Sequence, residues 1–161
     1  MIAKIFAQED FISHQYCDAI ISLFDELSQV EHRDTEVFEI THLYHENQMI
    51  RNLISMITGF TQTCFNDNRI YPNYSQIVRW NKNGQKPHYD FPHHFCTSII
   101  YLNDDFEGGE TVVGSNLIKP VKGKIVCFNG RDCLHSVLDQ SGESRYTFIT
   151  WHCNSNEWRP L

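Results

Sequence analysis

The stretch CTSIIYLNDDFEGGETVV, residues 96–113, contains two runs typical of β-strands. The runs Cys96–Tyr101 and Glu110–Val113 are rich in β-branched and aromatic residues, which favour extended backbone. Asn, Asp and two consecutive glycines, Gly108 and Gly109, lie between them and suit a tight turn before the second run. This stretch therefore predicts two strands of a β-sheet.

The same alternation of strand-like runs and turn residues continues on both sides of this stretch, over residues 74–153. Many short strands at this spacing are typical of a sandwich or barrel. The further predicted strands are Gln76–Trp80, Ile125–Phe128, Cys133–Val137 and Tyr146–His152.

The chain before residue 68 has helical periodicity instead. Ser13 is placed to cap a helix over residues 14–27, whose apolar residues recur at the spacing of one buried face. A second amphipathic helix is predicted over residues 46–65. We expect one domain over residues 1–161, mainly β, in which residues 1–68 form supporting helices and residues 74–153 form the β-core.

Composition narrows the class of protein. A chain of 161 residues with 41% apolar and 20% charged residues fits a single globular domain. No run approaches the ~18 apolar residues of a membrane span, and the N-terminus lacks the pattern of a signal peptide, so we expect a cytoplasmic protein. The six cysteines form no C-x-x-C pair, and we interpret Cys96, Cys127 and Cys153 as reduced core residues.

The formal net charge is −7, which disfavours nucleic acid as a partner because an acidic surface repels phosphates. A basic or neutral peptide, or a small molecule, fits this charge better. The sequence does not indicate an oligomeric state.

Three residues are candidate metal ligands. His88 and Asp90 stand two apart in KPHYDF, so extended backbone would place both side chains on one face. His135, in the strand-like run CLHSV, is the best candidate for a third ligand. Two histidines and a carboxylate on one face of a metal leave other positions open, which is the facial triad of non-haem iron(II) oxygenases.

Arg145 follows ten residues after His135, at the start of the last predicted strand. A guanidinium can bind a carboxylate through two parallel hydrogen bonds. A dicarboxylate that is bound to iron at one end would need such a partner at the other.

The segments YLNDDFEGGET, KPVKGKIVCFNG and LHSV, with the candidate ligands, resemble the catalytic core of prolyl 4-hydroxylase-type 2-oxoglutarate/Fe(II)-dependent dioxygenases. The resemblance covers roughly residues 76–152. It implies a double-stranded β-helix (a jelly-roll, cupin-like core) with helices packed outside. It also implies Fe(II), 2-oxoglutarate and O2 as cofactor and cosubstrates, with ascorbate as the reductant.

The resemblance assigns roles to individual residues. It implies that His88, Asp90 and His135 bind Fe(II) and that Arg145 pairs with the distal carboxylate of 2-oxoglutarate. Tyr101 matches a position whose phenol binds that carboxylate in some relatives, and Thr97 is expected to line the same pocket. Two tryptophans are expected at the substrate or pocket lining: Trp80, where many relatives have a tyrosine, and Trp151.

The implied reaction is hydroxylation of an unactivated C–H bond with conversion of 2-oxoglutarate to succinate and CO2. By family analogy, the favoured substrate is a prolyl residue in a peptide or protein. A free amino acid or other small molecule is the alternative. A nucleic-acid demethylase ranks lower, because such relatives carry a second arginine where this chain has Trp151. A non-enzymatic metal-binding barrel would have no use for Arg145 and Tyr101.

Overall fold

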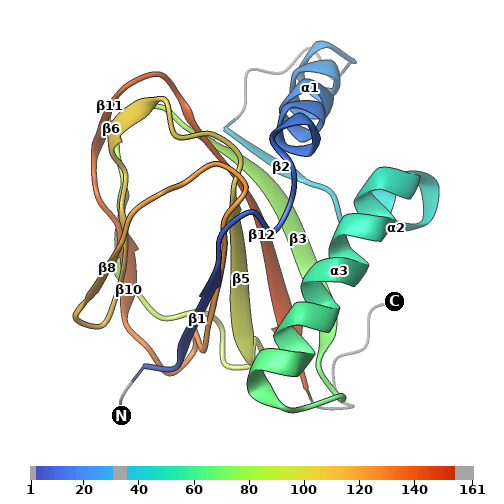
Figure 1. Ribbon diagram of the computed structural model, residues 1–161, viewed down its shortest axis with the longest axis vertical. Coiled ribbons are helices and arrows are strands. Elements are labelled where there is room, and N and C mark those ends of the chain that lie inside the picture. Colours follow the sequence, from blue (N-terminus) through green and yellow to red (C-terminus); the bar gives the residue numbers. More distant parts are fainter. Residues whose placement is uncertain (1–2, 31–35, 155–161) are drawn as a thin grey trace.

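The computed structural model describes residues 3–30 and 36–154 as three antiparallel sheets and three helices. The largest sheet has the order β1–β9–β5–β12–β3–β2, and a four-stranded sheet has the order β4–β10–β7–β8. The helices lie on one side of the large sheet and the four-stranded sheet lies on the other (Figure 1). The fold is thus mainly β with helices near the N-terminus, as predicted. None of the helices in the described ranges is long and apolar enough to cross a membrane.

The strands of the large sheet are β1 (Ile5–Gln8), β2 (Val37–Glu39), β3 (Tyr71–Trp80), β5 (Cys96–Tyr101), β9 (Ile125–Phe128) and β12 (Arg145–Cys153). Those of the four-stranded sheet are β4 (Gln85–His88), β7 (Thr111–Val113), β8 (Asn116–Ile118) and β10 (His135–Val137). A third, two-stranded sheet pairs β6 (Phe106–Gly108) with β11 (Gln140–Gly142).

The two long helices begin at side-chain caps. Helix α1 (His14–Val30) begins after Ser13, whose Oγ accepts a hydrogen bond from the Tyr16 amide at 3.1 Å, as predicted. Helix α3 (Gln48–Phe65) begins two residues later than predicted, because the Asn47 side chain caps it by accepting from the Ile50 amide at 3.1 Å. The short helix α2 (Leu43–Glu46) precedes it.

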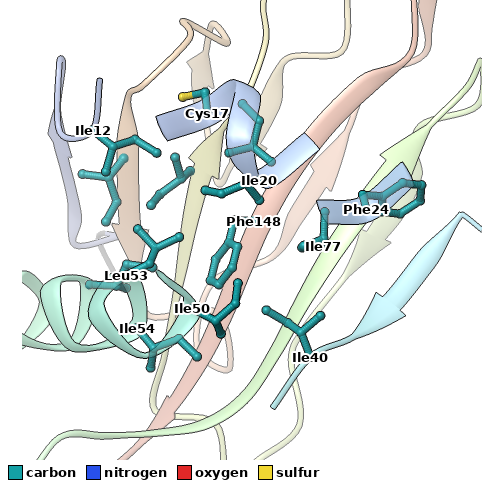
Figure 2. Close-up of a cluster of buried hydrophobic side chains, with 14 of the residues drawn as sticks. Ile12, Cys17, Ile20, Phe24, Ile40, Ile50, Leu53, Ile54, Ile77 and Phe148 are labelled. Atoms are coloured by element: carbon teal, nitrogen blue, oxygen red, sulfur yellow. The ribbon is translucent and has the colours of Figure 1, made fainter. Parts of the chain in front are cut away.

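The main hydrophobic core lies between these helices and the large sheet (Figure 2). Ile20 and Phe24 of α1 and Leu53 of α3 are fully buried in it. They pack in the same cluster as Ile77 of β3 and Phe148 of β12. Burying a side chain of this size stabilises a fold by about 1.5–3 kcal/mol, so this layer holds the large sheet in place.

The opposite face of the large sheet carries the polar residues of the candidate site. Side chains alternate between faces along a strand. Phe148 therefore faces the helices, whereas Arg145, Thr147, Ile149 and Trp151 of the same strand line the space between the two sheets. In register with β12, strand β5 adds Thr97 and Ile99 to that lining.

Several strands differ from the prediction. Residues 1–68, predicted to form supporting helices, also contain β1 and β2, which pair with β9 and β3 at the two edges of the large sheet. Both are too short to show a clear alternation, and so are β4, β6, β8 and β11, which the prediction also missed. Strands β5 and β9 have the predicted bounds.

All six cysteines are free, and Cys96, Cys127 and Cys153 are buried, which agrees with their interpretation as reduced core residues.

Candidate metal centre

The three predicted metal ligands converge between the two sheets. His88 ends β4 and His135 begins β10, and these two residues are paired directly across the strands. Asp90 follows β4 by two residues. One potential ligand atom from each residue lies within 4.8 Å of the others. Strand pairing therefore brings together His88 and His135, which are 47 positions apart in the sequence.

Backbone carbonyls orient both imidazoles. His88 Nδ1 lies 2.9 Å from the Lys86 carbonyl oxygen, and His135 Nδ1 lies 2.9 Å from the Cys133 carbonyl oxygen. A carbonyl can only accept a hydrogen bond, so Nδ1 carries the proton in the neutral ring, which leaves the Nε2 lone pair to bind a metal. Both histidines thus have the tautomer that a ligand requires.

The third ligand, Asp90, is held by polar neighbours. Its Oδ1 lies 3.5 Å from His135 Nε2, and its Oδ2 accepts a hydrogen bond from Thr97 Oγ1. Burial alone would raise the pKa of Asp90, but the polar neighbours His135, Thr97 and Trp151 lower it below its ordinary value. The carboxylate is therefore ionised at neutral pH, as a metal ligand must be.

Arg145 is a buried cation on the same side of the sheet. Only 1% of the residue is exposed, and its Nε has no hydrogen-bond partner. Burial lowers its pKa to about 10, so the guanidinium is still charged at neutral pH. No carboxylate in the described part of the chain pairs with it. Since a buried charge is costly unless it is paired, this environment fits an anionic ligand.

Aromatic and hydroxyl groups surround this guanidinium. Its Cζ lies 5.5 Å from the centre of the Trp80 ring and 5.4 Å from that of Tyr101. Thr111 Oγ1 accepts hydrogen bonds from Tyr101 Oη at 2.8 Å and from Arg145 Nη2 at 3.3 Å. The Trp80 indole N–H donates to Thr147 Oγ1 at 3.2 Å. The guanidinium is thus fixed in position before any ligand arrives.

A narrow pocket joins this arginine to the three metal ligands, and it contains all but one of the predicted site residues. The exception is Tyr101, which is fully buried behind Thr111. The lining comprises Trp80, Gln85, His88, Asp90, Thr97, Ile99, Thr111, His135, Val137, Arg145, Thr147, Ile149 and Trp151.

Sequence reasoning assigned no role to Thr111, Thr147 or Gly130. Thr147 stands two residues after Arg145 on one strand, so strand alternation was a signal for its position. Thr111 is the last residue of the stretch YLNDDFEGGET, but its contact with Arg145 depends on the pairing of distant strands. Gly130 has no side chain, and its contact with Asp90 is visible only in three dimensions.

A wider groove opens beside the metal ligands. It has a volume of about 380 Å³ and shares Gln85, His88, Asp90 and Trp151 with the inner pocket. Its rim carries Tyr89 and Phe91, which are 58% and 68% exposed. A substrate bound in this groove would lie directly against His88 and Asp90, two of the three candidate ligands.

The residues present fit Fe(II) and 2-oxoglutarate. Two imidazoles and one carboxylate on one face of an ion are the ligands of non-haem Fe(II) sites with open positions. The unpaired guanidinium of Arg145 provides a binding partner for a carboxylate at the far end of the pocket.

Comparison with known families agrees with this chemistry. Residues 75–153 match the sequence model of the 2OG-Fe(II) oxygenase superfamily. The matched segment contains all three candidate ligands and Arg145. The chain belongs to the 2OG-Fe(II) oxygenase superfamily and is a 2-oxoglutarate-dependent dioxygenase by class. No curated protein sequence shows significant similarity to it.

Solved structures with the same fold include prolyl hydroxylases. The viral collagen prolyl hydroxylase of Paramecium bursaria Chlorella virus-1 superposes with a TM-score of 0.79 at 18% identity, over 95% of this chain and 90% of that one. A Pseudomonas putida prolyl-4-hydroxylase gives 0.78 at 14% identity, over 96% and 94% of the two chains. A 2OG-Fe(II) oxygenase family protein of Burkholderia pseudomallei gives 0.74 at 18%, over 95% and 85%. These likenesses confirm the predicted jelly-roll fold.

Proposed function

We propose that this chain hydroxylates prolyl residues of a peptide or protein, with Fe(II) held by His88, Asp90 and His135. 2-Oxoglutarate would be bound by Arg145, and ascorbate would serve as the reductant. The observation that carries the choice of substrate is the groove beside the metal ligands, which is open along an aromatic rim rather than closed around a small molecule. The prolyl hydroxylases among the structures of the same fold support the same choice.

The rim suits a segment of polypeptide. Phe91 and Tyr89 expose large aromatic surfaces, and the Trp151 ring packs against Tyr74 at 5.7 Å between ring centres. A pyrrolidine ring is a compact apolar group that packs well on aromatic faces. Apolar pockets beside a few placed polar groups are the usual design of ligand sites.

When bound, Fe(II) and 2-oxoglutarate supply the oxidising chemistry: 2-oxoglutarate is decarboxylated to succinate and CO2, and oxygen from O2 is inserted into the substrate C–H bond. The residues of this chain would bind the metal and orient the dicarboxylate. Carbonyl groups keep both imidazoles in the ligand tautomer, and Thr97 holds Asp90. Arg145 would orient the dicarboxylate, while the buried walls around Ile99 and Ile149 would exclude water.

The test is succinate release from 2-oxoglutarate with Fe(II) and ascorbate, with and without a panel of proline-containing peptides whose mass is read in parallel. We expect peptide-stimulated succinate and one added oxygen atom per modified proline. Stimulation by free amino acids instead of peptides would overturn the choice of substrate and keep the enzyme class. Absence of succinate from folded, iron-loaded protein with every substrate would contradict the proposed activity.

A matched pair of variants tests the groove itself. Phe91→Ala removes an exposed rim residue, whereas Leu117→Ala removes an apolar residue of similar exposure, 64%, on strand β8. We expect Phe91→Ala to raise KM for the peptide several-fold and to leave peptide-independent succinate release unchanged. Leu117→Ala should change neither value. Equal effects of the two substitutions would contradict binding of the peptide at the rim.

A further inference from the structure

The metal ligand Asp90 lies in a cradle that two other residues form. Asp90 lies in the loop between β4 and β5. Strand pairing therefore does not fix its carboxylate, whereas it does fix His88 and His135. The carboxylate has two oxygens with different neighbours. Oδ1 points toward His135, at 3.5 Å from Nε2, and Oδ2 accepts the hydrogen bond from Thr97 Oγ1.

Thr97 is rigidly placed for this contact. It lies in the middle of the large sheet, paired with Phe128 on one side and with Trp151 on the other. Only 2% of the residue is exposed. A β-branched side chain on a buried central strand has few rotamers available, so its hydroxyl is held in one position.

Gly130 forms the other wall of the cradle. Its carbonyl oxygen accepts from the Asp90 amide at 3.2 Å, and its own amide donates to the Phe128 carbonyl at 3.0 Å. A Cβ at this position would overlap Asp90 Oδ2 and would lie 2.7 Å from Thr97 Oγ1. The φ angle of Gly130 is outside the left-handed region, so the need for glycine here is one of space and not of backbone conformation.

We infer that Thr97 and Gly130 are positioning residues that set the Asp90 carboxylate for monodentate metal binding. Thr97 binds Oδ2, which leaves Oδ1, the oxygen nearer His135, for the metal, and Gly130 leaves the volume that Oδ2 occupies. Groups that orient a ligand in this way contribute about 10- to 100-fold to metal affinity in other metalloproteins. The inference rests on the proposed function only in that His88, Asp90 and His135 bind a divalent metal.

The experiment measures binding of Mn(II), which stands in for Fe(II) without reacting with oxygen, by electron paramagnetic resonance of the free ion. Thr97→Val keeps the shape of the side chain and removes the hydroxyl, and Thr97→Ser restores the hydroxyl. We expect Thr97→Val to weaken Mn(II) binding about 10- to 100-fold and Thr97→Ser to bind within a few-fold of the native protein. The metal-free thermal midpoints of native protein and both variants should be similar.

A pair of glycine substitutions tests the second wall. Gly130→Ala should weaken Mn(II) binding at least as much as Thr97→Val does. Gly59→Ala is the control, because a Cβ at this helical position meets nothing within 4 Å, and it should leave binding unchanged. Should Gly130→Ala fail to fold, the two threonine variants decide the inference alone.

The outcomes separate the inference from the proposed function. Tight Mn(II) binding by both the native protein and folded Thr97→Val would overturn the positioning role and leave the metal site standing. Failure of the native protein to bind Mn(II) at all would overturn both. If both Thr97→Val and Thr97→Ser bind Mn(II) weakly, the hydroxyl of Thr97 is not what positions Asp90, and the inference is overturned.

Discussion

The two faces of the six-stranded sheet use their polar residues differently. On the face toward the helices, hydroxyl groups pair with one another: Thr61 with Ser98 at 2.9 Å, and Ser75 with Thr150 at 3.1 Å. On the face toward the four-stranded sheet, the charged guanidinium of Arg145 has no carboxylate partner in the described residues, and its Nε makes no hydrogen bond. The first face therefore serves stability, and the second keeps binding capacity available for a ligand. Substitutions on the two faces should accordingly have opposite kinds of effect.

The largest loss of stability is expected on the helix-facing side. Phe148 is fully buried in the core between the helices and the sheet. Phe148→Ala should lower the free energy of unfolding by about 3–5 kcal/mol, since it removes a large buried side chain and leaves a cavity. Urea denaturation of the metal-free protein measures this change. A loss below about 1 kcal/mol would mean that this face does not hold the fold together.

On the pocket-facing side, we expect Arg145→Met to act in the opposite direction. The substitution removes a buried cation that has no carboxylate partner in the described residues, so the metal-free protein should be as stable as the native protein or more stable. Affinity for 2-oxoglutarate should fall by about 30- to 1000-fold, because a buried, charge-assisted contact is lost. Calorimetric titration of the Mn(II)-loaded protein and urea denaturation give the two readings. A destabilised variant with unchanged affinity would reverse the assignment of the two faces.

A buried histidine on the helix-facing side predicts a loss of stability in acid. His152 is fully buried, and burial lowers its pKa to about 3. Below pH 6.5 the unfolded chain binds a proton on this residue, and the folded chain does not until about pH 3. Stability should therefore fall as the pH drops through this window, by about 2 kcal/mol at pH 5 from this residue alone.

Denaturation at pH 7.5 and pH 5 of the native protein and His152→Asn measures this contribution. The variant should lose less stability between the two pH values than the native protein does. His42→Gln is the control, because the His42 side chain is 60% exposed, and its pH dependence should match that of the native protein. Parallel pH profiles for native protein and His152→Asn would exclude the effect.

The smallest effect, on 2-oxoglutarate affinity, is expected from Trp80→Phe on the pocket-facing side. The substitution keeps an aromatic ring near the Arg145 guanidinium and removes the indole N–H that donates to Thr147. One neutral hydrogen bond contributes about 0.5–1.5 kcal/mol, so 2-oxoglutarate affinity should fall less than about tenfold. A loss as large as that of Arg145→Met would mean that Trp80 contacts the ligand directly.

The sequence predicted the parts of the molecule that depend on local pattern. Runs of β-branched and aromatic residues between turn residues located β5 and β9 with their bounds, and a capping serine located the start of α1. The spacing of His88 and Asp90, with His135 in a later strand, indicated the ligand set. Arg145 was predicted from chemistry together with its position at a strand start, and the structure places it at the end of the same pocket.

Other parts depend on tertiary contacts that no local pattern encodes. Strands β1 and β2 are extended because they pair with β9 and β3 as the edge strands of the large sheet, and their own sequences are too short to specify this. The same holds for Gly130. Its sequence context indicates an ordinary turn glycine, and only the structure places the Asp90 carboxylate against it. Tyr101 was expected to reach the carboxylate of 2-oxoglutarate, and its hydroxyl donates to Thr111 in this structure.

The most direct test of the central claim is an anaerobic titration of 2-oxoglutarate into the Fe(II)-loaded protein, followed by visible absorbance. The account predicts a metal-to-ligand charge-transfer band in the native protein, its absence in His135→Ala, and a need for far more 2-oxoglutarate in Arg145→Met. The outcome that would contradict the account is an unchanged band in His135→Ala, or no band from native protein that holds one iron per chain.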